Sequence, residues 1–151
     1  MNWSITPELA VEYGVSSFNN VSIVDHLAKV VKDIRKAIPD RNFNGLAVID
    51  LEEWRPLFKM NWGKQTVYQK QSVALVQSKN PGLSSKAALK LAEEEFNRAA
   101  RIFFVWTLRI ARSIRPKAHW GYYDYPFCNS HAGDEPNEYS CNDLAKQLND
   151  E

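Results

Sequence analysis

Residues Gly45–Trp54 read GLAVIDLEEW, a short apolar run that ends abruptly in acidic residues. An apolar run of this length, preceded by glycine and rich in branched side chains, predicts a buried β-strand. If the extended conformation persists to its end, Asp50 and Glu52 point to the same face, because they are two residues apart. Two carboxylates side by side at the end of a buried strand are costly to keep ionised together. The stretch therefore predicts a functional site.

Helices and a second strand are predicted around this strand. Apolar residues at three- and four-residue steps predict a helix over about 22–38, a second over about 64–79, and a long third helix over about 84–115. In the third helix the residues expected to face inward include Leu89, Phe96, Phe103 and Trp106. Residues 118–126 alternate aromatic side chains between prolines, which predicts a second strand. Because strands alternate with long helices, parallel pairing through a crossover is expected.

The composition excludes several classes of partner. The chain has 151 residues, enough for one domain with a substantial core, and a formal net charge of +1. Acids and bases nearly balance, so neither nucleic acid nor an anionic membrane is an expected partner. No apolar run approaches the roughly 20 residues of a membrane span. The first residues lack the basic-then-apolar order of a signal peptide. The cysteines and histidines lack zinc-site spacing, so no metal is expected.

Asp50 and Glu52 have a spacing that suits acid–base catalysis. Such chemistry needs one carboxyl group held protonated beside another that stays ionised, which burial and like charge can arrange. The D-x-E pattern alone is a weak signal, however. A structural role, in which the acids cap a helix or form an ion pair with Arg55, therefore stays open as the alternative.

Several segments of the chain resemble animal hyaluronidases, glycoside hydrolase family 56. The similar segments are GLAVIDLEEWRP at 45–56, Asn61-Trp62, SVALVQ at 72–77, WGYYDYPFC at 120–128 and Asn149-Asp150. The resemblance covers about residues 14–151 and leaves residues 1–13 as an unmatched lead-in. It implies an α/β fold, a partial (β/α) TIM-like barrel comprising about strands 3–4 with flanking helices. A full barrel needs about 250 residues, so the chain is expected to be truncated at both ends.

The resemblance also implies an activity. It is that of an endo-β-N-acetylhexosaminidase that hydrolyses hyaluronan, and often some chondroitin, without a cofactor. In that family the residue matching Glu52 protonates the glycosidic oxygen, and the substrate's own N-acetyl carbonyl attacks the anomeric carbon. The residue matching Asp50 orients the acetamido group, and the one matching Tyr123 contacts it. Glu53 is expected on the opposite strand face, with no catalytic role.

Other residues point to a disulfide, a glycan and side chains that pack beside the cleft. Cys128 and Cys141 match a family disulfide, which in a short loop contributes about 3 kcal/mol under oxidising conditions. Asn20-Val21-Ser22 is a glycosylation sequon, which predicts a glycan on Asn20 of a secreted protein. A secreted or lysosomal location is therefore expected for the full-length parent. The residues expected to pack beside the cleft rather than to bind sugar are Trp54, Arg55 and Trp62.

Two alternatives remain open from the sequence. The first is a truncated, catalytically inactive hyaluronidase-like protein that is unstable or binds glycosaminoglycan weakly. An unclosed barrel exposes strand edges and an apolar inner face, which favours aggregation. The second is a related acetamido-directed glycosidase such as a chitinase. That class fits less well, because Val48 stands where chitinases typically have one more Asp.

Overall fold

The computed structural model describes residues 23–123, 125 and 147. Asn20, Cys128 and Cys141 lie outside the described residues, so the predictions made for them stay predictions. The elements in chain order are α2 (Ile23–Ala37), β1 (Leu46–Ile49), the 3-10 turns η1 (Phe58–Met60) and η2 (Gly63–Gln65), α3 (Thr66–Lys79), α4 (Ser85–Ile114) and β2 (His119–Tyr122). No helix among the described residues is long and apolar enough to cross a membrane.

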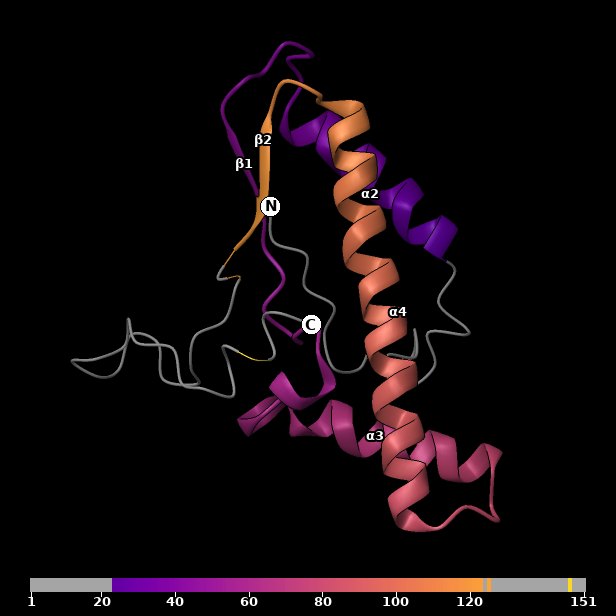
Figure 1. The fold of residues 1–151 in the computed structure, drawn as a ribbon. Helices are drawn as coiled ribbons and strands as arrows, with labels where there is room; N and C mark the ends of the chain where they lie inside the picture. The colour runs from indigo at the N-terminus through magenta and orange to yellow at the C-terminus, as the bar shows by residue number, and fades with distance from the viewer. Residues whose placement is uncertain (1–22, 124, 126–146, 148–151) are drawn as a thin grey trace, which may run out of the picture.

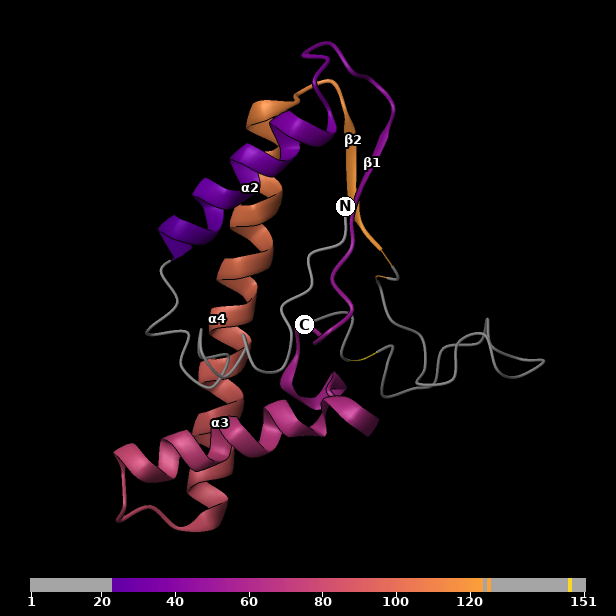
Figure 2. The same ribbon diagram turned by 180° about the vertical axis from the view of Figure 1, so that it is seen from behind.

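The two strands form a parallel sheet, as predicted. Leu46 pairs with His119 and Ile49 pairs with Tyr122, and the connection between the strands runs through α3 and α4. Helix α4 runs beside the two strands, α2 packs against α4, and α3 crosses the N-terminal half of α4 (Figure 1). The view from behind shows the same arrangement (Figure 2). Within residues 23–123 the sheet has two strands and does not close into a barrel.

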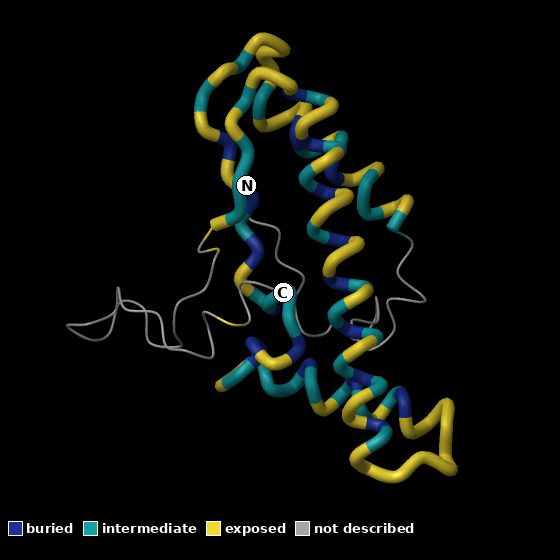
Figure 3. Tube along the Cα trace, viewed as in Figure 1, coloured by how far each residue is buried: buried dark blue, intermediate teal, exposed yellow. Residues whose placement is uncertain are grey.

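Strand β1 is shorter than the predicted strand, since ladder pairing of Leu46–Ile49 ends well before Trp54. The alternation of burial nevertheless continues past the strand. Ala47, Ile49 and Leu51 are buried against the helices, whereas Leu46 is 82% and Val48 48% exposed on the other face (Figure 3). At Glu53 and Trp54 the chain bends, and Trp54 leaves the line of the strand to fill the core between α3 and α4.

Helix α4 begins within a residue of the predicted start, and Ser84 is its N-cap: the Ser84 hydroxyl accepts a hydrogen bond from the backbone N–H of Ala87 at 3.3 Å. The prediction that Leu89 and Trp106 face inward is wrong, because both are exposed. The buried row is instead dominated by small side chains, which let α2 and α3 approach closely; it consists of Ala88, Ala92, Phe96, Ala100, Phe103, Thr107 and Ala111.

A histidine links α2 to α4. His26 Nε2 lies 2.8 Å from the hydroxyl oxygen of Thr107, and its ring packs on Phe103 with the two centroids 3.9 Å apart. Burial, with a smaller contribution from the positive charge of Lys29, lowers the pKa of His26 from 6.5 to about 4. The folded protein therefore holds this imidazole neutral at a pH where an unfolded chain would protonate it.

We expect the free energy of unfolding to fall as the pH drops from about 6.5 to about 4. The pKa of His26 is lower in the folded state than in the unfolded state, so the unfolded chain takes up the proton first and is favoured by acid. After allowance for partial exposure, the loss is about 2 kcal/mol. Urea unfolding at neutral and acidic pH measures it, and His26→Gln should show a smaller loss. Equal pH dependence in the two proteins would contradict the assignment.

Candidate active site

Three predicted site residues follow the carboxyl ends of the two parallel strands. Asp50 and Glu52 continue the face that begins with Leu46 and Val48, and Tyr123 extends β2 beyond its last paired residue. The backbone N–H of Tyr123 donates to the carbonyl of Ile49 at 2.9 Å, which continues the register and sets Tyr123 beside Asp50. The structure therefore brings the three residues to one edge and one face of the sheet, the place where parallel α/β barrels carry polar site residues.

The three side chains differ in accessibility. Glu52 and Tyr123 are exposed, whereas Asp50 is half-buried. Asp50 Oδ1 is fully buried, yet it accepts no hydrogen bond from any residue in the part of the chain that the structure describes. A buried acceptor in this state is costly unless a donor reaches it, so this oxygen is suited to bind an N–H or O–H of a ligand.

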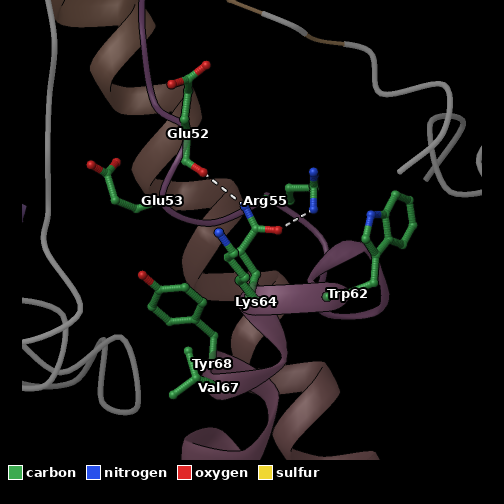
Figure 4. A pocket seen from close by; sticks show the side chains of 9 residues that line it. Glu52, Glu53, Arg55, Trp62, Lys64, Val67 and Tyr68 are labelled. Atoms are coloured by element: carbon green, nitrogen blue, oxygen red, sulfur yellow. Dashed lines mark hydrogen bonds between the residues drawn. The ribbon is translucent and has the colours of Figure 1, made fainter. Parts of the chain in front are cut away.

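A pocket of about 400 Å³ adjoins Glu52. Figure 4 shows its walls, which come from the segment after β1 and from the beginning of α3; the lining residues are Glu52, Glu53, Arg55, Trp62, Gly63, Lys64, Gln65, Val67 and Tyr68. Carboxylates, cations and aromatic rings together give this pocket charged groups beside flat apolar surfaces, a composition that suits a charged sugar chain.

Glu53, predicted to lie on the opposite strand face without a catalytic role, also lines this pocket. The chain bends at Glu53 and Trp54, and Glu53 lines the same pocket as Glu52. It also acts on Tyr68: burial raises the pKa of the Tyr68 hydroxyl, and the negative charge of Glu53 raises it further. Figure 4 shows the two glutamate carboxylates pointing in different directions.

Gln65 connects Glu52 to the rest of the pocket. Its side-chain Nε2 donates to the backbone carbonyl of Glu52 at 3.0 Å, and its Oε1 accepts from Nη1 of Arg55 (dashed lines in Figure 4). The Arg55 guanidinium also donates to the carbonyl of Met60 at 3.1 Å and lies 5.0 Å from the ring centroid of Trp62. Arg55 therefore braces the pocket, as expected for it. The role of Gln65 went unpredicted, since a glutamine just before a helix has no motif.

The loop after Glu53 is held by buried amides. Asn61 accepts from the backbone N–H of Arg55 at 2.8 Å and donates to the carbonyls of Arg55 at 3.0 Å and Leu57 at 2.8 Å. Gln69 of α3 and Asn97 of α4 bind the backbone of the same loop. Such a polar clamp satisfies loop groups that the core would otherwise leave unpaired. It fixes the position of the segment that carries the candidate acids.

The sequence of the chain matches a known enzyme family over most of its length. The family model of glycoside hydrolase family 56, described as hyaluronidase, matches residues 8–151. The chain belongs to the hyaluronidase family. It is 42% identical to a chondroitin hydrolase of Caenorhabditis elegans over 83% of this chain and 27% of that protein. It is also 40% identical to hyaluronidase-1 of Homo sapiens, over 78% of this chain and 27% of that protein.

The fold of the chain also matches that of a solved hyaluronidase. A crystal structure of bee venom hyaluronidase in complex with a hyaluronic acid tetramer matches with a TM-score of 0.79 and 34% identity, covering 88% of this chain and 41% of that one. The predicted family and the predicted partial (β/α) barrel are thereby confirmed. This hyaluronidase-family chain spans 27% of the length of the nematode and human relatives and 42% of the length of a hyaluronidase of Polybia paulista.

Proposed function

We propose that this hyaluronidase-family chain carries the catalytic segment of an endo-β-N-acetylhexosaminidase that hydrolyses hyaluronan, with chondroitin as a second substrate. The observation that carries the proposal is the meeting of Asp50, Glu52 and Tyr123 on one face at the carboxyl ends of parallel strands. The names of relatives support the substrate class: bee venom hyaluronidase has been solved with a hyaluronic acid tetramer, and the nematode relative is a chondroitin hydrolase.

Each of the three residues takes a distinct role in the proposed reaction. Glu52 gives its proton to the glycosidic oxygen as the bond to the leaving sugar breaks. The carbonyl oxygen of the substrate's N-acetyl group attacks the anomeric carbon, and water then opens the cyclic intermediate while Glu52 takes back a proton. The buried Asp50 Oδ1 accepts the acetamido N–H and stabilises the charge that develops there, and Tyr123 contacts the same group. Two displacements at one carbon retain its configuration.

The test of the proposed function is the cleavage of hyaluronan. The 151-residue chain and any longer product of the same gene are incubated with hyaluronan, and new N-acetylhexosamine reducing ends are measured. Proton NMR of the first product should show the β-anomer, because the mechanism retains configuration. Neutral chitin oligosaccharides serve as the control and should be cleaved poorly. Release of the α-anomer first, or no cleavage by any form of the protein, would reject the proposal.

Gln65→Ala should lower kcat for hyaluronan about tenfold with little change in KM. The substitution removes the hydrogen bonds that connect the Glu52 backbone to Arg55, so the carboxyl group loses its fixed position without losing a substrate contact. Gln77→Ala is the matched control, since Gln77 is exposed on α3, the helix that begins directly after Gln65. If both variants give the same kcat, or if Gln65→Ala changes only KM, the positioning role is wrong.

One observation favours the second candidate, a non-catalytic protein that binds glycosaminoglycan weakly. Leu46 and Val48, on the face that carries Asp50 and Glu52, are exposed, so nothing in residues 23–123 covers the apolar lining below the acids. A chain that binds hyaluronan in a pull-down but releases no reducing ends, alone or in a longer form, would select this candidate over the enzyme.

We further place the protein in the secretory pathway or the lysosome. The support comes from the family resemblance, by which Cys128 and Cys141 match a disulfide of the kind that persists in an oxidising compartment, and from the sequon at Asn20. Peptide mapping without reduction should find a peptide that joins Cys128 to Cys141, and a shift in mass after glycosidase treatment should locate the glycan on Asn20.

A further inference from the structure

Four arginines form a row along α4. Arg98, Arg101, Arg109 and Arg112 are all exposed, and at 100° per residue they project from the side of the helix opposite its buried row. At 1.5 Å of rise per residue, the row is about 21 Å long. We call these four residues the arginine row.

No acid within the described part of the chain neutralises the arginine row. None of its members forms an ion pair with a described residue, and no acidic residue occurs between Phe96 and Arg115. Three acids precede the row on the helix. Glu93 pairs with Lys59 at 2.8 Å and Glu94 lies 3.8 Å from Lys90, while Glu95, the nearest, forms no ion pair with Arg98 in the described part of the chain. On an ordinary solvated helix face, cations are interspersed with acids four residues away, which the second half of α4 lacks.

An exposed aromatic surface lies between the two pairs of arginines. Trp106 is 48% exposed, and the Arg109 guanidinium lies over its ring, 5.2 Å from the centroid. Ile102 and Val105 are exposed beside it. Cations that flank a flat apolar platform match a polymer with carboxylates at regular intervals and sugar rings between them.

We propose that the arginine row with Trp106 is a second binding surface for a hyaluronan chain, outside the cleft. It is separate from the candidate catalytic residues, because α4 packs on the Ile49 face of the sheet, whereas Asp50 and Glu52 lie on the opposite face. The choice of hyaluronan as the polymer rests on the proposed function, whereas the surface itself is argued from the exposed arginines and Trp106. The surface holds a long substrate near the protein by electrostatic attraction, which raises the local concentration of bonds to be cleaved.

The experiment measures binding of size-defined hyaluronan to the full chain by fluorescence anisotropy at two salt concentrations. All proteins carry Glu52→Gln, so that the probe stays intact. One variant replaces Arg98, Arg101, Arg109 and Arg112 with Gln, which preserves helix propensity. The control replaces four exposed lysines of α3 and the first half of α4 with Gln and thus removes the same charge; these are Lys70, Lys79, Lys86 and Lys90. Far-UV circular dichroism checks that both fold alike.

We expect the arginine variant to bind hyaluronan about tenfold more weakly than the parent and the lysine variant to stay within about twofold. Trp106→Ala should also weaken binding, and added salt should shrink the difference between the variants. Equal losses in the two charge variants, no binding by the parent, or equally tight binding of poly-glutamate would overturn the proposal. The anisotropy experiment measures binding without cleavage. A protein that binds hyaluronan through the arginine row but cleaves none would contradict only the proposed function. A protein that cleaves hyaluronan but binds equally well without the arginine row would contradict only the second binding surface.

Discussion

Glu52→Gln should lower the rate of hyaluronan cleavage about a thousandfold, the largest effect on activity that we expect for any single substitution. The amide keeps the size and polarity of the side chain but has no proton to give to the glycosidic oxygen, and general acid catalysis contributes about 10²- to 10⁴-fold. Because Glu52 is exposed and does not belong to the core, the variant should unfold at the same denaturant concentration as the parent. A rate assay on matched amounts of folded protein measures the effect.

The neighbouring glutamate provides a sharp control. Glu53 lines the same pocket and carries the same charge, but it faces Tyr68 and lies off the face shared by Asp50, Glu52 and Tyr123. Glu53→Gln should therefore cost at most about tenfold in kcat. If Glu53→Gln costs as much as Glu52→Gln, or if cleavage survives Glu52→Gln, the assignment of the proton donor is wrong.

Trp54→Ala should have the largest effect on stability, a loss of about 3–5 kcal/mol in the free energy of unfolding. The Trp54 side chain is 1% exposed and contacts three rings edge-on, with centroid distances of 5.9 Å to Phe96, 5.6 Å to Phe103 and 5.3 Å to Phe104. Truncation leaves a cavity between α3, α4 and the loop that follows Glu52. Urea unfolding measures the loss.

A second tryptophan is the matched control for this substitution. Trp106 lies on the exposed side of α4, so Trp106→Ala should change the free energy of unfolding by no more than about 0.5 kcal/mol. Trp54→Phe, which keeps an aromatic ring in the cluster, should recover part of the loss. Equal effects of the Trp54→Ala and Trp106→Ala substitutions would mean that the aromatic cluster does not hold the loop in place.

Much of the local structure was predictable from the sequence. The helices have nearly the expected limits because their caps and stops are local: Ser84 caps α4, and Pro39 follows the end of α2. The shared face of Asp50 and Glu52 was predictable as well, since alternation along an extended chain depends only on the count of residues. The family resemblance carried the prediction for Tyr123, and the register of β2 sets that residue beside Asp50.

Other features depended on contacts that no local pattern records. The bend at Glu53 and Trp54 places Glu53 in the pocket wall, because Trp54 gains more by entering the cluster on α4 than by extending the strand. Trp106 was expected in the core because it is apolar. The buried row of α4, in which alanine is the commonest residue, makes the close contacts instead and leaves Trp106 exposed to solvent. Gln65 reaches the carbonyl of Glu52 only because the loop between them folds back and brings these two residues, 13 positions apart, together.

The sequence by itself determined the chemistry of GLAVIDLEEW: a buried strand that ends in two acids on one face, in the pattern of a hyaluronidase. Only the tertiary structure decided what surrounds those acids, namely the pocket walls from α3, the polar clamp on the loop and the arginine row on the far side of α4. The physical reason is the distance along the chain between the residues that interact. Alternation and capping act between residues a few positions apart, whereas a contact such as His26 with Thr107 joins residues 81 positions apart and exists only once the helices have packed.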